Sequence, residues 1–422
     1  MLIFIAACFL PSLLVAALTT AAMRKISPMV GLIDRPAARK VHRTPTPLGG
    51  GVGIVLGVIL PMGLAHLAVW LMVRNPSWQP EGFAQLGVNW QGALAESPKL
   101  WAILAGGVVL SVMGLWDDLR NLPWLPRLAV QFLVAAGLVA FGVRGTVFVP
   151  LPWIGYALTV LWIMVLVNSF NFLDNMDGLS SGIALAASLL FAAVMLTLPG
   201  EPRWLVGGMM LVLAGALAGL LLHNWSPARI FMGDSGSYFI GLLMACLTVV
   251  GTFYQEDLGS RHVILAPLCI LAVPLYDFCS VVLIRLSQKR SPFQPDKSHF
   301  SHRLVELGLK PRNAVLTIHL ATLTTGLGAL LLYRVADWSA AETTTRNEQV
   351  QAETRRSKPV AVAALGRGGP GIGAFQRAQS VRGGAVARAV ARADRTRRGR
   401  PDVVDHPALA GCGADLDLGP LS

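Results

Sequence analysis

Apolar stretches of about 20 residues recur along this chain, and they restrict its folds more than any other feature. Each stretch is long enough to cross the roughly 30 Å hydrocarbon core of a bilayer as a helix. Only 14% of the 422 residues are charged and 54% are hydrophobic, whereas about a quarter of the residues of a soluble domain are charged. The sequence therefore predicts an all-α, polytopic membrane bundle. About ten spans are expected, over residues 1–22, 51–73, 100–115, 128–143, 151–168, 179–198, 204–222, 236–253, 262–284 and 313–333.

The connections between these spans alternate between polar and plain. Because the polar ones fall on every second connection, they meet on one side of the membrane, and their basic residues assign that side to the cytoplasm. A channel or carrier would more often place polar residues inside the spans. The net charge of +12 then reflects topology and anionic headgroups, and no nucleic-acid partner is expected. Nearly all Asp, Asn, His and Arg side chains that could do chemistry lie in loops 23–50, 116–127, 169–178, 223–235 and 285–312.

The residues from about 341 onward differ in composition from the rest. They are rich in Arg, Gly, Ala and Thr, contain almost no aromatic residues and show no apolar periodicity, which predicts disorder. We therefore divide the chain into a membrane domain, residues 1–335, and a basic tail, residues 336–422. Ten spans would put this tail outside, against the positive-inside tendency. Two explanations stay open: a span has been missed, or the reading frame changes near residue 341.

An aspartate pair, Asp117 and Asp118, directly follows an apolar span. Adjacent carboxylates raise each other's pKa and are costly unless they face a cation. Carboxylates together with substrate phosphates are the usual ligands of Mg²⁺. The alternative is a solvated helix end whose charge Arg120 and Arg127 neutralise. The pair taken alone does not decide between these two interpretations.

The segment 168–182, NSFNFLDNMDGLSSG, breaks the hydropathy sharply at the mouth of a span. Asn168, Asn171, Asp174 and Asp177 are three residues apart, so a helical turn would stack them on one face. Two Asn and two Asp on one face exceed what a helix cap needs. This favours a functional site over turn chemistry alone.

Asp234 lies between two glycines in the segment 230–241, IFMGDSGSYFIG, at the head of another span. Small residues allow a backbone to approach a phosphate, and a helix N-terminus offers N–H donors to it. An ordinary N-cap accounts for Asp or Ser at this position equally well.

His299 and His302 lie three residues apart in the segment 291–309, and Arg303 follows them directly. These donors suit the oxygens of a diphosphate. A zinc site is the competing idea, but no cysteine or third histidine is near. A basic cytoplasmic loop is the plain alternative.

The segment 34–54, DRPAARKVHRTPTPLGGGVGI, places Lys40 before a proline-rich turn and three glycines at the head of a span. It suits either an anion-binding loop or simple anchoring on the positive side of the membrane. Three glycines without a Walker lysine are a weak nucleotide signature.

In this order, the stretches DRPAARKVHRTPTPLGGGVGI, GLWDD, NSFNFLDNMDGL, FMGDSGS and DKSHFSHRL resemble the polyprenyl-phosphate N-acetylhexosamine-1-phosphate transferases, and the likeness covers about residues 1–335. It implies an enzyme of the bacterial inner membrane with about ten or eleven helices and a cytoplasmic active site. Members of this family transfer a sugar-1-phosphate from a UDP-N-acetylhexosamine to a polyprenyl phosphate such as undecaprenyl phosphate. They release UMP and use Mg²⁺, or Mn²⁺ in its place.

The histidine motif is more similar to that of the initiators of surface polysaccharide, which use UDP-GlcNAc. The enzyme that takes UDP-MurNAc-pentapeptide in peptidoglycan synthesis stays open as an alternative. From another class, so does a membrane transporter in which Asp174 and Asp177 relay protons. The oligomeric state, monomer or homodimer, is open as well.

The resemblance also implies roles for single residues. Asp234 matches the family's Mg²⁺ ligand, and Asn168 lines the metal site with it. Asp117 and Asp118 match an aspartate pair that deprotonates the lipid phosphate or organises the metal. The family's histidine motif usually reads H-x-H-H, and here Ser301 takes the third place with a hydroxyl that donates but has no charge. The other implied positions are catalytic Asp174, Asp177, His299 and His302, and substrate-binding Lys40, Arg127, Asn168, Asn171 and Arg303.

Overall fold

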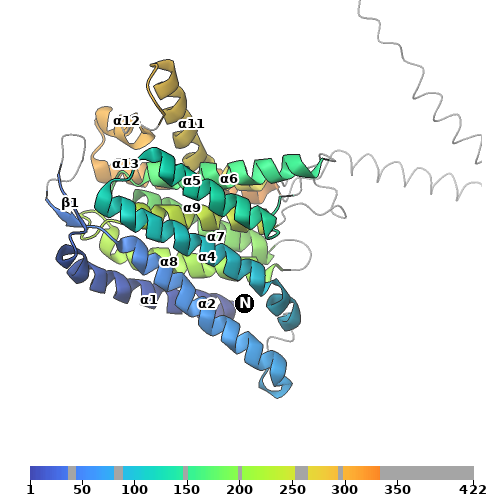
Figure 1. The fold of residues 1–422 in the computed structure, drawn as a ribbon. Coiled ribbons are helices and arrows are strands. Elements are labelled where there is room, and N and C mark those ends of the chain that lie inside the picture. Colours follow the sequence, from blue (N-terminus) through green and yellow to red (C-terminus); the bar gives the residue numbers. More distant parts are fainter. Residues whose placement is uncertain are drawn as a thin grey trace, which may run out of the picture. The chain divides into compact units, whose positions relative to one another are not determined.

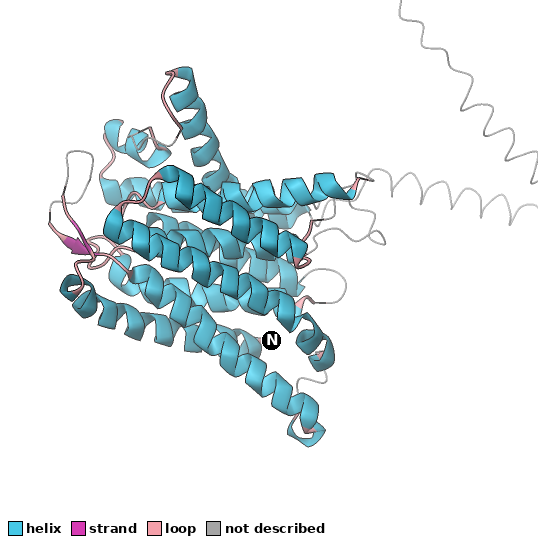
Figure 2. Cartoon of the chain, viewed as in Figure 1, coloured by secondary structure: helices cyan, strands magenta, loops and turns pink. Residues whose placement is uncertain are grey.

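The computed structural model describes residues 1–36, 44–79, 89–145, 151–197, 202–251, 265–292 and 298–332. Helices make up nearly all of this part of the chain (Figure 1). Two short strands pair antiparallel, with Ile33 opposite Pro47, and lie at one end of the bundle (Figure 2). The elements are α1 Leu2–Met29, β1 Ile33–Asp34, β2 Thr46–Pro47, α2 Gly50–Arg74, the 3-10 helix η1 Pro76–Trp78, α4 Trp90–Arg120, α5 Trp124–Ala140, α6 Pro152–Leu173, α7 Leu179–Thr197, α8 Trp204–Asn224, α9 Gly233–Val250, α10 Ala266–Ile270, α11 Ala272–Ser287, α12 Phe300–Glu306 and α13 Pro311–Leu332.

Eight of the described helices, α1, α2, α4, α6, α7, α8, α9 and α13, are long and apolar enough to cross a membrane. This confirms the predicted polytopic bundle, but two of the expected spans differ. The one at 128–143 is α5, an apolar helix of only 17 residues. The one at 262–284 is divided at Leu271 into α10 and α11. Pro274 accounts for the break, because it has no N–H to donate to the carbonyl of Ile270 and its ring crowds that carbonyl.

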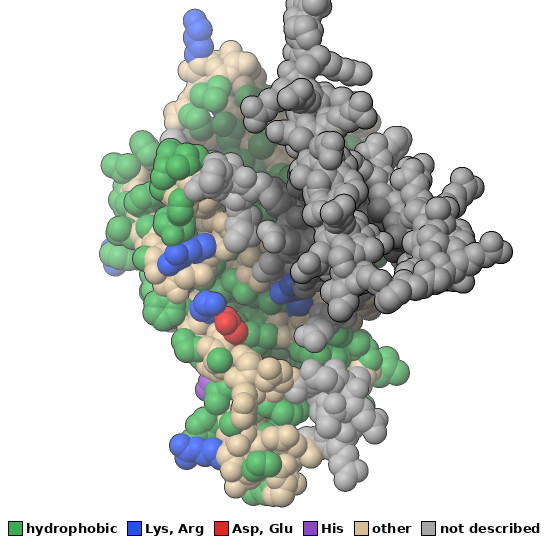
Figure 3. Space-filling view, turned by 90° about the vertical axis from the view of Figure 1, so that its right-hand side faces the viewer, with side chains coloured by type: hydrophobic (Ala, Val, Ile, Leu, Met, Phe, Trp, Pro, Cys, Tyr) green, Lys and Arg blue, Asp and Glu red, His purple; other side chains and the backbone are tan. Residues whose placement is uncertain are grey.

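The interior of the bundle is built around α9, which packs between α4 and α6, while α8 packs against α1 and α7. In the most apolar part of each helix, 83% of the residues of α9 are buried and 78% of those of α7 and α8, against 11% for α1. Hydrophobic side chains are spread over the outside, with few charged ones among them, in the described part of the face seen in Figure 3. The outer helices therefore present an apolar surface to lipid.

Small residues bring the N-terminus of α9 close to α2 and α4. A Cβ atom on Gly51 would collide with the backbone of Gly236, and Gly114 lies in the same way against the backbone of Asp234. Ser111 and Ser235 join α4 to α9 through a hydrogen bond of 2.8 Å between their hydroxyls. Close contacts and hydrogen bonds of this kind hold helices together in lipid, where burial of apolar surface gives little.

The segment before α2 is tied to the segment before α9. Phe231 N donates to Pro47 O (2.8 Å), and the N–H groups of Gly50 and Gly51 donate to the carbonyls of Phe231 and Met232 (2.9 Å each). The first N–H groups of α2 thus donate to backbone carbonyls. They are not open to the anion that the glycine run could have bound.

Candidate active site

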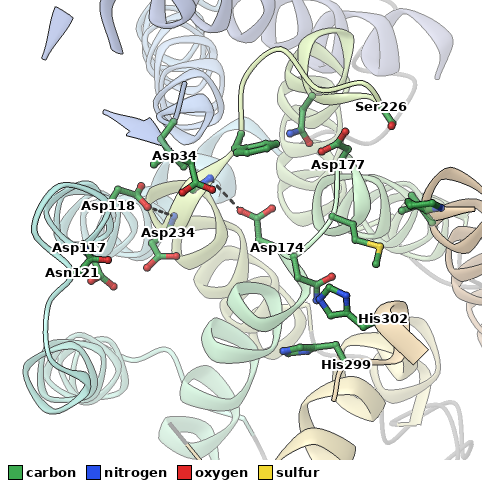
Figure 4. Close-up of a pocket in the computed structure, with 18 of the residues that line it drawn as sticks. Asp34, Asp117, Asp118, Asn121, Asp174, Asp177, Ser226, Asp234, His299 and His302 are labelled. Carbon is green, nitrogen blue, oxygen red and sulfur yellow. Dashed lines mark hydrogen bonds between the residues drawn. The ribbon is translucent and has the colours of Figure 1, made fainter. Parts of the chain in front are cut away.

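Several helix ends that lie far apart in the sequence surround a cavity of about 700 Å³. In Figure 4, Asp34, Asp118 and Asp234 lie on one side of Asp174, and the histidines lie on the other side. The predicted residues that line this cavity are Asp117, Asp118, Arg127, Asp174, Asp177, Asp234, His299 and His302. The polar loops do meet, as expected, at one end of the bundle.

Asp117 is held in place by the turn between α4 and α5. Its Oδ2 accepts a hydrogen bond from Arg127 Nη1 and its Oδ1 accepts one from Leu122 N, both at 2.7 Å. The residue is only 5% exposed, so it is a buried carboxylate paired with Arg127, not a solvated helix end. Arg127 Nη1 also lies 3.8 Å from Asp234 Oδ2. Asp117 therefore orients Arg127 between two carboxylates.

Carboxylates occupy the first two amides of α9. Gly233 N donates to Asp174 Oδ2 and Asp234 N donates to Asp118 Oδ1, each at 3.2 Å (dashed lines in Figure 4). Gly233 has a φ of +76°, and a Cβ atom there would collide with the Asp118 carboxylate, so this position requires glycine. These N–H groups were expected to meet a phosphate. They hold protein carboxylates instead.

Asn168 and Asn171 face different neighbours, which corrects the expectation that four residues stack on one face. Asn171 Nδ2 donates to Asp234 Oδ1 (2.7 Å), one layer behind the cavity. Asn168 Nδ2 donates to Gln131 Oε1 (2.7 Å) on α5. Since α6 ends at Leu173, the two aspartates of the motif are not helical. The structure does not bring Asn168 to the cavity wall.

Three further predicted residues are placed as follows. Asp177 lines the cavity, and its Oδ2 accepts a hydrogen bond from Ala228 N (3.0 Å). Arg303 does not line the cavity, and its Nη2 donates to Tyr276 OH (3.4 Å). Lys40 lies in the segment 37–43, outside the described residues, so its role stays a prediction.

The histidine motif is fixed at two points. His299 Nδ1 lies 2.9 Å from Asp277 Oδ2, and Phe300 N donates to Asp277 Oδ1 (2.7 Å). Ser301 is buried, and its Oγ donates to Asn175 Oδ1 (2.7 Å). The serine at the unusual place in the motif thus links α12 to the loop after α6. It does not line the cavity.

Burial makes Asp174 a weaker acid than an ordinary aspartate. The pKa of its carboxyl is raised to about 7, chiefly by burial and then by the charges of Asp118, Asp177 and Asp34, while the N–H of Gly233 lowers it. A carboxyl with this pKa is only partly ionised at neutral pH. A cation in the cavity would favour its charged form.

The oxygen donors around Asp174 fit a hard cation such as Mg²⁺. Asp118 Oδ2 is buried and has no hydrogen-bond partner in the part of the chain that the structure describes. Within the same part, no three His, Cys, Asp or Glu side chains already form a metal-binding group. Mg²⁺ typically takes one or two carboxylates and completes its shell with waters and substrate phosphates. An incomplete set of carboxylates suits an ion that binds together with a diphosphate.

Some residues of the site were not singled out in the sequence. Asp34 and Arg312 line the cavity, and Asp34 opens one of the motifs. Asn224 also lines it, and it accepts hydrogen bonds from Gly178 N (3.1 Å) and Ser181 Oγ (3.0 Å). Asp277 was detectable as a carboxylate inside an apolar stretch, which is costly without a function. Asn224 gave no such signal, because an amide at the end of a span resembles an ordinary cap.

The fold and the site together define a multi-pass membrane protein with an acidic, histidine-flanked cavity at one end of its bundle. Residues 100–252 match glycosyl transferase family 4. The chain is 32% identical to a protein of Bacillus subtilis named a probable undecaprenyl-phosphate N-acetylglucosaminyl 1-phosphate transferase, over 80% of this chain and 87% of that protein. The chain therefore belongs to the polyprenyl-phosphate N-acetylhexosamine-1-phosphate transferases of glycosyl transferase family 4.

Two further relatives carry similar names. A decaprenyl-phosphate N-acetylglucosaminephosphotransferase of Mycobacterium tuberculosis is 33% identical, over 71% of this chain and 76% of its own length. The undecaprenyl-phosphate alpha-N-acetylglucosaminyl 1-phosphate transferase of Escherichia coli K12 is 28% identical, over 75% of this chain and 81% of its own length.

Proposed function

We propose that this protein transfers GlcNAc-1-phosphate from UDP-GlcNAc to a polyprenyl phosphate, such as undecaprenyl phosphate, and releases UMP. The observation that carries the proposal is the cavity at the helix ends, where carboxylates and histidines that lie far apart in the sequence meet in a membrane protein of this family. The names of the relatives favour GlcNAc over MurNAc-pentapeptide. The position of the polar groups at span ends argues against a transporter.

The reaction exchanges one phosphorus–oxygen bond for another. A non-bridging oxygen of the lipid phosphate attacks the β-phosphorus of UDP-GlcNAc. The bond from that phosphorus to the oxygen bridging to the α-phosphorus breaks, and this oxygen leaves with UMP and the electron pair. A phosphate monoester has its second pKa at about 6 and is largely ionised at neutral pH. Positioning and neutralisation of charge therefore matter more than a strong general base.

Each side of the cavity has a part in this proposal. Both carboxylate oxygens of Asp117 already accept hydrogen bonds, so Asp117 acts through Arg127. The guanidinium of Arg127 attracts phosphate oxygens. His299 and His302 donate to the diphosphate from the opposite wall. Arg312 adds a further positive charge at the rim of the cavity.

Mg²⁺ is part of the proposal, with Asp234 and Asp118 as its protein ligands. When bound, it supplies Lewis-acid neutralisation of diphosphate charge. The unpartnered Oδ2 of Asp118 supports this choice. Asn171 would hold the Asp234 carboxylate in orientation. Asn168, the other predicted ligand, does not line the cavity, so its side chain would have to move before its Oδ1 could take part.

We further propose that the cavity faces the cytoplasm of the bacterial inner membrane. Basic residues lie where α1 and α11 end, before the segments that bring Asp34 and His299 to the cavity. They are Arg24, Lys25, Arg285, Lys289 and Arg290, and they support a cytoplasmic position by the positive-inside tendency. UDP-sugars are cytoplasmic substrates, so the two arguments agree.

The purified full chain, reconstituted with undecaprenyl phosphate, tests the proposal. With UDP-[¹⁴C]GlcNAc and Mg²⁺ we expect equal amounts of UMP and of a radiolabelled lipid, and loss of both with EDTA. Label that crosses sealed vesicles without UMP release would favour a transporter. Turnover with UDP-MurNAc-pentapeptide alone would favour the peptidoglycan enzyme. Full turnover in EDTA would exclude the metal.

A further inference from the structure

We propose that Asp277, which lies inside α11 and does not line the cavity, is a positioning residue for His299 in the transfer reaction. The inference rests on the proposed function, since His299 is the residue through which Asp277 would act. It adds a residue that lies outside the histidine motif and outside the polar loops.

Both oxygens of Asp277 are used on the histidine motif. The side chain is fully buried, with Oδ2 at 2.9 Å from His299 Nδ1 and Oδ1 at 2.7 Å from Phe300 N. A carboxylate next to Nδ1 selects the form of the ring that carries a proton there. The nitrogen left for a substrate is then Nε2, on the other side of the ring of a residue that lines the cavity.

The other neighbours of the His299 ring restrict it without competing for Nδ1. Phe172 meets it edge to face, with ring centroids 5.8 Å apart, and the ring of His302 lies at 6.1 Å. Arg285 lies over the ring of Phe172 at 5.0 Å, so Phe172 separates its charge from the imidazole. Asp277 and His302 are titratable groups that face this ring directly.

The position of Asp277 is costly unless it serves the motif. The buried residues Val273, Asp277, Val281 and Arg285 recur every four residues along α11, so they form one stripe facing the bundle. A carboxylate in such a stripe must be hydrogen-bonded to be tolerated, and the two oxygens of Asp277 meet His299 Nδ1 and Phe300 N. The side chain thus fixes the orientation of the ring, with Nδ1 toward Asp277 and Nε2 left for a diphosphate oxygen.

The test uses the full chain with Asp277→Asn, His299→Gln and the double variant. Asp277→Asn keeps the shape of the side chain but removes its charge. We expect kcat/KM to fall on the order of 10- to 100-fold, as for loss of a charged hydrogen bond. We also expect its pH profile to differ from that of the wild type, because the charge beside the imidazole has been removed. In the His299→Gln background, Asp277→Asn should lower kcat/KM little further, because the imidazole through which Asp277 acts is already absent.

Glu306→Gln on α12 is the matched control, because it makes the same change of charge at an exposed residue of the same motif helix. We expect it to leave kcat/KM and the pH profile unchanged. An unchanged pH profile in Asp277→Asn, or a double variant whose loss equals the product of the two single losses, would overturn the proposal.

A measurement on the wild-type chain covers the case in which Asp277→Asn does not fold. In ¹⁵N-histidine NMR spectra, with the His299 signals assigned from His299→Gln, a protonated Nδ1 is expected. A ring protonated only at Nε2 would overturn the proposal. Absence of turnover by the wild type would be a failure of the proposed function, and this NMR result is independent of it.

Discussion

Replacing Arg127 by Met should separate the structural from the functional role of the aspartate pair. The change leaves the Asp117 carboxylate, 5% exposed, without its cation. Removing one partner of a buried pair costs about 3–5 kcal/mol. Because the Arg127 side chain is 26% exposed, water can take over part of its role, and we expect a loss of about 2–3 kcal/mol in the free energy of unfolding. Adding Asp117→Asn removes the unpaired charge and should restore at least half of the loss.

Unfolding of the purified chain in mixed micelles measures these free energies, and the transfer assay measures activity. Lys99→Met on α4, the helix that carries Asp117, breaks an exposed pair, Lys99 with Glu96 at 2.8 Å, and should cost less than about 0.5 kcal/mol. Stability should return in the double variant while activity stays low, because Arg127 is absent in both. If the losses of the two single variants simply add, Asp117 is not held by Arg127 and the reasoning is refuted.

Three further changes test other parts of the site. Gly233→Ala should lower stability by about 1–3 kcal/mol because of the positive φ, and the transfer rate by more than about tenfold because it displaces Asp118. Gly137→Ala is the control, because a Cβ atom at Gly137 would have no atom within 4 Å, and it should be neutral in both assays. The pKa of Asp174 is about 7 in the folded chain and about 3.9 in an unfolded one. Between these pH values the folded state without metal binds more protons, so its stability should fall as the pH rises from about 4 to about 7. Thermal unfolding of Asp174→Asn should depend less on pH, and an equal slope would contradict the raised pKa. Asn224→Ala leaves the buried N–H of Gly178 and the hydroxyl of Ser181 without their acceptor, so we expect it to lower the unfolding free energy by about 2–4 kcal/mol; a loss below about 1 kcal/mol would show that these groups find other partners.

The gathering of the polar loops could be predicted because it depends only on the order of spans. Once apolar stretches long enough for a membrane are found, every second loop must lie on the same side, and Asp118, Asp174 and Asp234 follow. Which groups touch is a different matter. The position of Asn168 was predicted from its spacing to Asn171. Its partner Gln131 lies 37 residues away in the sequence on another helix, and a local sequence pattern cannot predict such a contact.

The same limit applies to the histidine side of the cavity. The motif itself was visible, and the hydroxyl of Ser301 was expected to donate a hydrogen bond, as it does to Asn175. Its direction, away from the cavity, depends on how α12 packs. Asp277 was read as part of a span, because hydropathy averages one carboxylate over about 20 apolar neighbours. The helix break at Leu271 was missed for the same reason, although Pro274 in the sequence could have indicated it.

Lipid touches this protein mainly through its outer helices. In its most apolar part α1 has 11% of its residues buried and α2 has 39%, whereas α9 has 83%. Changes in bilayer thickness act on helices that face lipid, which tilt at modest cost. α1 contributes no side chain to the cavity wall and packs chiefly on α8 and α2, so this helix can follow the membrane while α9 keeps its register with α2, α4 and α6. The carboxylates at the head of α9 are in this way insulated from the mechanical state of the bilayer around them.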